Sequence, residues 1–230
     1  MNNIKIRKHP KIYNVFVSGP LTNPRLYTRN LVPRRKIYDE KLIEVDGIEY
    51  RSWDPERSKL AAIFINDPST SFLRKANRCL YLGAASGTTI SHLSDILPNG
   101  LIYAVEFSER SIRQLIQNTS DRKNVIPILA DARYPIEYAN AIFTDIDLVY
   151  QDVAQPNQAE IMVKNMDYYL KEKGTFIFLI KSQSIDSISK SEKIYSEEKN
   201  ILQKAGFKIQ ESINIHNFAK NHIALIGEKK

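Results

Sequence analysis

Glycine and cysteine are scarce in this chain of 230 residues, which has eight glycines and one cysteine. The single cysteine, Cys79, excludes an internal disulfide and a cysteine-rich metal site, and its place in the apolar run 79–82 indicates a small core residue. The sequence has no run of about 18 apolar residues, and residues 1–20 lack the apolar stretch of a signal peptide. We therefore expect a cytoplasmic protein without a membrane-spanning segment.

Acidic side chains are absent before Asp39, whereas nine basic side chains precede it. Residues 1–75 hold 15 basic and 8 acidic side chains, and residues 76–230 hold 18 of each, so the formal charge of +7 belongs to the first third. A basic face concentrates polyanions by releasing their counterions, which makes nucleic acid or an acidic protein the leading class of partner. A surface that is basic only for solubility is the alternative.

From residue 77 onward, short β-rich apolar runs alternate with segments of helical periodicity, the pattern of a parallel sheet covered by helices. The expected strands are 78–82, 101–107, 125–129, 146–150 and 175–180, and the expected helices lie near 88–97, 109–118, 157–170 and 191–205. Two further strands, 207–215 and 223–226, follow with no helix between them, so we expect the sheet to end in an antiparallel pair.

Residues 1–54 differ from the rest of the chain. The segments 12–17 and 41–50 alternate apolar and polar residues, and turn residues occur at Ser18-Gly19-Pro20 and Asp46-Gly47, so we predict a small antiparallel β module. Residues 57–65 predict a helix that leads into a second domain, 55–230. The fold class is α/β, a Rossmann-like sheet with the β module before it.

Gly83 and Gly87 are the only two glycines within ten residues of each other, and they lie between an expected strand and an expected helix. Close approach of a ligand to the backbone, beside the free N–H groups of a helix N-terminus, explains this placement. An ordinary tight turn is the alternative. The loop is not the dinucleotide pattern G-x-G-x-x-G, and it lacks the G-K-[ST] ending of a phosphate loop.

Carboxylates end the next three strands at Glu106, Asp131 and Asp152. Glu106 comes nineteen residues after Gly87, where a carboxylate accepts hydrogen bonds from both hydroxyls of a ribose in dinucleotide-binding folds. Each acid alone is equally well explained as a solvated loop residue. Because parallel strands end at the same edge of a sheet, the glycine loop and the three acids together predict one ligand site.

The segment 155–160 also has a structural interpretation. Asn157 would cap the following helix, and Glu160 would close a capping box with it. Capping does not explain Asp152, which still belongs to the end of the strand.

The strings LYLGAASGTT (80–89) and DVAQPNQAE (152–160) resemble the fibrillarin family, the S-adenosylmethionine-dependent RNA ribose 2′-O-methyltransferases of guide-RNA particles. Further similar segments are TRNLVP (28–33), RSKLAA (57–62) and NH (221–222), so the resemblance covers most of the chain. It implies a class I methyltransferase sheet. The Gly/Arg-rich arm of the eukaryotic members is absent, which implies the short archaeal form.

The resemblance implies S-adenosylmethionine as the methyl donor, and we expect no metal. The residues it implies for the cofactor site are Gly83, Ala85, Thr88, Thr89, Glu106, Phe107, Asp131, Ala132, Asp152, Val153, Ala154 and Gln155. It implies a catalytic set of Lys59, Asp152, Lys181 and His222. The chain departs from the family at Gln151, where relatives commonly have Glu, and at Ser182-Gln183, where Ala-Arg is usual.

Methyl transfer from a sulfonium to a ribose hydroxyl is an in-line displacement, and alignment of the reacting atoms can contribute ~7 to 11 kcal/mol. We expect Lys181 to remove or relay the proton of the 2′-hydroxyl, with Asp152 orienting Lys181. Lys59 would position the acceptor, and His222 would complete the polar ring. The sequence leaves open which of the two lysines is neutral.

The resemblance further implies that a box C/D guide RNA selects the target nucleotide in rRNA or tRNA. A Nop-family scaffold protein and a kink-turn-binding ribosomal-type protein would complete the particle, with the basic first third serving to dock RNA or scaffold. Three alternatives remain: a nicotinamide dehydrogenase, disfavoured by the missing third glycine, a catalytically idle RNA-binding or scaffold subunit, and a methyltransferase for protein glutamine.

Overall fold

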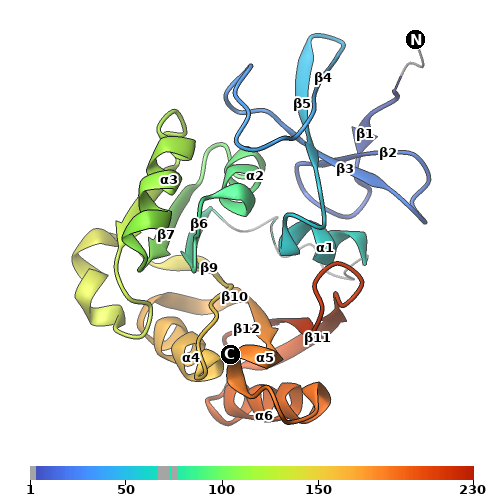
Figure 1. Cartoon of the computed structure of the whole chain (residues 1–230). Coiled ribbons are helices and arrows are strands. Elements are labelled where there is room, and N and C mark those ends of the chain that lie inside the picture. The colour runs from blue at the N-terminus through green and yellow to red at the C-terminus, as the bar shows by residue number, and fades with distance from the viewer. Residues whose placement is uncertain (1–3, 67–72, 74–76) are drawn as a thin grey trace.

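The computed structural model describes residues 4–66, 73 and 77–230, and its strands form two separate sheets (Figure 1). Within these ranges the first sheet has five antiparallel strands in the order β1-β2-β3-β5-β4. They are β1 (Arg7–Lys8), β2 (Val15–Ser18), β3 (Arg25–Arg29), β4 (Leu42–Val45) and β5 (Ile48–Trp53). The expected β module is confirmed. The sequence pattern did not reveal β3, whose buried centre is flanked by an exposed arginine at each end.

The second sheet has seven described strands in the order β11-β12-β10-β9-β6-β7-β8. They are β6 (Arg78–Leu82), β7 (Leu101–Glu106), β8 (Val125–Leu129), β9 (Ile146–Gln151), β10 (Leu170–Lys181), β11 (Lys208–Asn214) and β12 (His222–Glu228). Strands β6 to β10 are parallel, whereas β12 runs antiparallel to β10 and β11 antiparallel to β12. Both the parallel sheet and its antiparallel end are as the sequence predicts.

Helices cover both faces of this second sheet (Figure 1). They are α1 (Lys59–Ile65), α2 (Thr88–Ile96), α3 (Glu109–Thr119), α4 (Gln158–Tyr169), α5 (Ser182–Ile185) and α6 (Ser191–Lys204), with the 3-10 segment η2 (Pro135–Ala141). Apolar side chains of α1, α2 and α3 belong to one core cluster, and those of α4, α6 and η2 belong to the other. In the described ranges no helix is both long and apolar enough to cross a membrane.

Strand β6 shows how the two cores are separated. Cys79 and Tyr81 pack into the first cluster, and Leu80 and Leu82 pack into the second. Successive side chains of a strand point to opposite faces, so a strand covered on both sides is apolar throughout. Cys79 is fully buried, which confirms it as a core residue.

The N-terminus of α4 differs from the expected capping box. Asn157 occupies the N-cap position, but its side chain makes no capping hydrogen bond, and Glu160 is exposed. The N–H of Ala159 donates instead to Glu198 Oε2 of α6, at 2.7 Å. Burial raises the pKa of Glu198 to about 7. The capping prediction is wrong because a carboxylate distant in sequence satisfies this helix end.

A buried ion-pair cluster fixes the first sheet to α2. The side chain of Arg51 on β5 is completely buried, with Nη2 2.7 Å from Glu40 Oε1 and Nη1 2.8 Å from Asp95 Oδ2. Asp95 Oδ1 also lies 2.6 Å from Nη1 of Arg122. Arg51 therefore belongs to the internal structure, although the charge count places it in the basic first third.

Replacing Arg51 by methionine is expected to lower the free energy of unfolding by about 3 to 5 kcal/mol, because Glu40 is left as a buried charge without its partner. The matched change Arg113→Met removes an exposed pair with Glu109 and is expected to cost less than about 0.5 kcal/mol. Urea denaturation measures both variants. Equal effects in the two would contradict a structural role for the cluster.

His92 on α2 lies beside the cluster and has both ring nitrogens occupied. Its Nδ1 is 2.8 Å from Thr28 Oγ1, and its Nε2 is 2.6 Å from the hydroxyl of Tyr38. The ring stacks on Trp53, with 5.0 Å between the ring centroids. The imidazole is thus held between side chains of β3, of β5 and of the loop between β3 and β4, with no access to water.

The contribution of His92 to stability is expected to fall as the pH drops below about 6.5, whereas the raised pKa of Glu198 acts in the opposite direction. Burial lowers the pKa of His92 well below 6.5, and the charges of Arg51 and Arg122 act in the same direction. Below about pH 6.5 the unfolded chain therefore binds a proton at His92 and the folded chain does not. This difference lowers the free energy of unfolding by up to about 1.4 kcal/mol for each pH unit. His92→Gln should flatten this slope in urea titrations at several pH values. The exposed control, His216→Gln, should keep it, and an unchanged slope in H92Q would count against the mechanism.

Candidate active site

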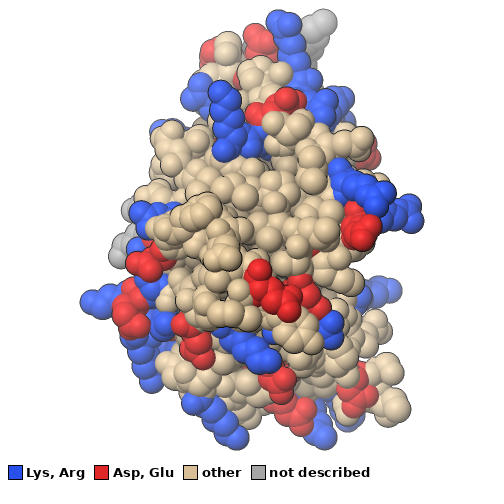
Figure 2. Space-filling view, turned by 90° about the vertical axis from the view of Figure 1, so that its left-hand side faces the viewer, with Lys and Arg blue, Asp and Glu red and all other residues tan. Residues whose placement is uncertain are grey.

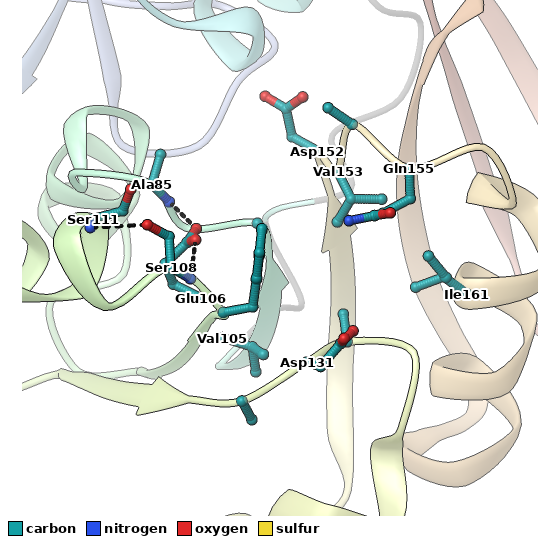
Figure 3. A pocket seen from close by; sticks show the side chains of 15 residues that line it. Ala85, Val105, Glu106, Ser108, Ser111, Asp131, Asp152, Val153, Gln155 and Ile161 are labelled. Atoms are coloured by element: carbon teal, nitrogen blue, oxygen red, sulfur yellow. Dashed lines mark hydrogen bonds between the residues drawn. The ribbon is translucent and has the colours of Figure 1, made fainter. Parts of the chain in front are cut away.

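A cavity of about 310 Å³ lies where β6, β7, β8 and β9 end (Figure 3). Its lining residues are Gly83, Ala85, Val105, Glu106, Phe107, Ser108, Ser111, Ala130, Asp131, Ala132, Asp152, Val153, Ala154, Gln155 and Ile161. All the residues predicted for the cofactor line it except Thr88 and Thr89. The other lining residues are apolar or small, and their types carry no signal in the sequence: Val105, Ser108, Ser111, Ala130 and Ile161.

Thr88 and Thr89 begin α2, outside the lining of the cavity. The hydroxyl of Thr89 is 3.0 Å from the hydroxyl of Ser58, directly before α1. The carbonyl of Thr88 accepts a hydrogen bond from the Ser91 side chain, at 2.8 Å. The Thr89 hydroxyl therefore connects the start of α2 to the N-cap residue of α1, and a direct contact of either threonine with a cofactor stays a prediction.

The glycine loop packs so closely against its neighbours that there is no space for a Cβ at either glycine. Gly83 has φ +83°, and a Cβ added there would lie 2.2 Å from the carbonyl oxygen of Asp152. Gly87 has φ +91°, and a Cβ there would lie 2.7 Å from Leu115 Cδ1. From the sequence, approach of a ligand is the expected reason for the two glycines. The structure adds that the loop packs against the end of β9 and against α3.

Two carboxylates of the cavity are oriented by neighbouring N–H groups. Glu106, which is nearly buried, accepts hydrogen bonds from the backbone N–H groups of Ala85, at 2.8 Å, and Ser108, at 2.9 Å (Figure 3). Asp131 accepts from the guanidinium of Arg133, and these hydrogen bonds hold the pKa of Asp131 below its usual value. Glu106 thus shapes the glycine loop while its oxygens line the cavity.

Apolar walls complete the cavity. The ring of Phe107 is 64% exposed although it lines a hollow, which leaves a flat aromatic surface available to a ligand. Val105 and Ile161 line the cavity as well. Predominantly apolar walls with a few oriented polar groups are typical of small-molecule sites.

Lys59 forms an ion pair with Asp152, which lines the cavity. Lys59 is the first residue of α1, and its Nζ lies 2.8 Å from Asp152 Oδ1 and 2.6 Å from Oδ2. The two side chains are 28% and 23% exposed. Asp152 also lines the cavity, so one carboxylate belongs to both the cavity and the predicted catalytic set.

Lys181 and His222 are directly opposite each other on β10 and β12. Opposed residues of an antiparallel pair have their side chains on the same face of the sheet. His222 Nδ1 is 2.7 Å from the carbonyl oxygen of Lys220, so this nitrogen carries the proton. His222 Nε2 is buried and has no hydrogen-bond partner among the described residues.

The imidazole of His222 is neutral and presents a free lone pair on Nε2. Burial lowers the pKa of His222 below 6.5, and the charges of Lys59 and Lys181 lower it further, while the hydrogen bond to Lys220 and the charge of Asp152 oppose them. Lys59 pairs with Asp152, Lys181 lies opposite His222, and the charges of the other three residues act on the His222 ring. The structure brings all four of them together.

The partner of Asp152 differs from the expected one. We expected Asp152 to orient Lys181, but both of its oxygens accept from Lys59. Lys59, the first residue of α1, reaches Asp152 from a different helix than the one that follows β9. The sequence spacing contains no information on which lysine is closer to Asp152.

Within the described part of the chain, no group of three or more His, Cys, Asp and Glu side chains is arranged to bind a metal ion.

A model of the fibrillarin family matches residues 6–230. The chain belongs to the fibrillarin family. A fibrillarin-like rRNA/tRNA 2′-O-methyltransferase of Methanococcus maripaludis strain C7 is 43% identical to it over 228 residues, which are 99% of this chain and 97% of the relative.

Solved fibrillarin structures match over nearly the whole chain. The fibrillarin pre-rRNA processing protein of Methanococcus jannaschii has a TM-score of 0.91 and 41% identity, with all of both chains covered. Aeropyrum pernix fibrillarin, in complex with natively bound S-adenosyl-L-methionine, has a TM-score of 0.89 and 37% identity, covering 97% of this chain and 98% of that one. The fibrillarin chain of a fibrillarin/Nop5p complex has a TM-score of 0.83 and 38% identity, covering 95% and 99%. The family and the α/β fold expected from the sequence are confirmed.

Proposed function

We propose that this chain transfers a methyl group from S-adenosylmethionine to the ribose 2′-hydroxyl of rRNA and tRNA nucleotides. The observation that carries the proposal is that Asp152 belongs to two sets of residues. It lines the cavity, and it pairs with Lys59 in the same set as Lys181 and His222. A cofactor site and a set of proton-handling groups therefore meet at one residue. The name of the M. maripaludis relative supports this activity.

The cavity fits the proposed cofactor, which the A. pernix relative carries. Glu106 presents carboxylate oxygens that are already oriented by two N–H groups and suit the hydroxyls of a ribose. The exposed ring of Phe107 offers a flat surface for a purine. When bound, S-adenosylmethionine would supply the electrophilic methyl group on its sulfonium.

We propose that Lys181 and His222 receive the proton that the 2′-hydroxyl loses. As the oxygen forms its bond to the methyl carbon, the carbon–sulfur bond breaks with its electron pair going to sulfur, and the hydroxyl proton must leave. Lys181 takes or relays this proton, and the free Nε2 of His222 is the neighbouring acceptor. Lys59, held at two oxygens by Asp152, positions the acceptor ribose.

We further propose that the chain works in a particle with a box C/D guide RNA, a Nop-family scaffold protein and a kink-turn-binding protein. The fibrillarin/Nop5p complex supports the scaffold partner.

Figure 2 views the molecule from the side of α3, and the centre of this face carries few charges. Exposed Ile116, Leu129 and Ile136 belong to α3, β8 and η2. Such a surface releases few counterions, so we do not expect RNA to dock there and assign RNA docking to the basic first third.

The test is reconstitution with guide RNA and the two partner proteins, with labelled methyl transfer scored at the nucleotide that the guide selects. Digestion of the product should yield a 2′-O-methylnucleoside, whereas methylglutamine would establish the protein-methylating alternative. No transfer by the assembled particle would favour an idle scaffold subunit. Calorimetry should detect S-adenosylmethionine binding and no NAD binding, and the reverse result would favour a dehydrogenase.

A further inference from the structure

Strand β10 extends beyond its parallel neighbour at the active site. The pairing with β9 ends where Phe178 faces Gln151, and Lys181 is paired only with His222 on the other side. On the open side, the N–H of Lys181 donates to Gln158 Oε1, at 2.9 Å, and Gln158 Nε2 donates to the carbonyl oxygen of Lys181, at 3.1 Å. The side-chain amide of Gln158 thus takes the place of a missing strand.

Gln158 suits this position for chemical reasons. A carboxamide has a donor and an acceptor side by side, so it satisfies the N–H and the C=O of one residue together. Gln158 is fully buried, and buried backbone groups without a partner destabilise the folded state by about 1 to 3 kcal/mol each. An apolar side chain of the same size would fill the space but would leave both backbone groups of Lys181 unpaired.

Gln158 is itself held in place from the cavity side. It is the first residue of α4, which follows the cavity-lining segment 152–155. Its carbonyl oxygen accepts a hydrogen bond from the side-chain Nε2 of Gln151, at 2.8 Å. Gln151 directly precedes Asp152, so a short chain of hydrogen bonds connects the Asp152 end of β9 with the Lys181 end of β10.

We propose that Gln158 is a positioning residue, whose carboxamide fixes the end of β10 and thereby places the Lys181 amine against the acceptor hydroxyl. The proposal rests on the proposed methyl transfer. It concerns placement, because Gln158 does not line the cavity and its side-chain amide bonds to the backbone of Lys181 and not to the amine. A shift of about 1 Å in a reacting group can reduce a rate about 100-fold.

The first experiment compares Gln158→Met with wild type in the assembled particle. We expect the single-turnover rate of methyl transfer to fall roughly 10- to 100-fold, with the dissociation constant of S-adenosylmethionine within about threefold of wild type. Asn124→Leu is the matched control. It removes a buried amide that bonds to Ser94 and Leu97 and directly precedes β8, at the edge of the sheet opposite the cavity, so the transfer rate should stay near wild type.

Gln158→Glu separates placement from a general loss of stability. A protonated carboxyl can accept from the N–H of Lys181 and donate to its carbonyl, whereas an ionised carboxylate lacks the donor. The rate relative to wild type should therefore rise as the pH is lowered for Q158E and stay constant for Q158M. A wild-type rate in Q158M, or a ratio independent of pH in both variants, would overturn the inference. Failure of the wild-type particle to transfer methyl groups would instead overturn the proposed function.

Discussion

Lys181→Ala is expected to slow methyl transfer in the assembled particle by about 10²- to 10⁴-fold, the usual contribution of a positioned acid or base. The proposed step needs a group that takes or relays the hydroxyl proton at the end of β10. His222, directly opposite, has a free Nε2, but the proton would reach it through the Lys181 amine, which the alanine variant lacks. The affinity for S-adenosylmethionine should change less than about threefold, because Lys181 does not line the cavity.

The comparison needs a control that removes a lysine without touching the site. Lys164 lies on the exposed side of α4, so Lys164→Ala should transfer methyl groups at the wild-type rate. Single-turnover assays with labelled cofactor measure the rates, and calorimetry measures the affinity. A near-normal rate in K181A would exclude Lys181 from the chemistry. A parallel loss of cofactor affinity would instead assign it to binding.

The glycine loop and the three acids converge on one cavity, as the sequence predicts, because one physical regularity determines where they lie. Parallel strands end at the same edge, so a glycine loop after β6 and acids after β7, β8 and β9 had to converge. Glu106, Asp131 and Asp152 do line one cavity. The periods of the strands and helices are local properties of the sequence, which explains why most of their bounds differ from the expected ones by only one or two residues.

What the sequence did not reveal is the choice of partner between distant residues. Asn157 and Glu160 match the capping box, yet a carboxylate from α6, Glu198, satisfies the helix end. Asp152 pairs with Lys59 rather than with Lys181. In the folded chain several side chains are able to bond to the same polar group. The packing of distant elements determines which of them is close enough to do so. The same holds for Arg51, which contributes to a basic composition and is buried against two acids.

Gly83→Ala is expected to reduce the affinity for S-adenosylmethionine by at least about 100-fold, or ~2.8 kcal/mol. Alanine at φ +83° costs about 1 to 2 kcal/mol by itself. The larger effect comes from the new Cβ, which would lie 2.2 Å from the carbonyl oxygen and 2.9 Å from the carbonyl carbon of Asp152. Backbone atoms of two packed elements cannot yield as a flexible side chain does, so the loop or the end of β9 must move, and both line the cavity.

Gly206 provides a control with the same strain and no overlap. Its φ is +91°, and a Cβ added there meets no atom within 4 Å. Gly206→Ala should therefore lower stability by about the same 1 to 2 kcal/mol and leave cofactor affinity unchanged. Calorimetry with S-adenosylmethionine and thermal unfolding of both variants separate binding from stability. Should G83A bind the cofactor as G206A does, the close approach of the glycine loop to β9 would have no part in shaping the cavity, and the assignment of this edge as the cofactor site would lose its main geometric support.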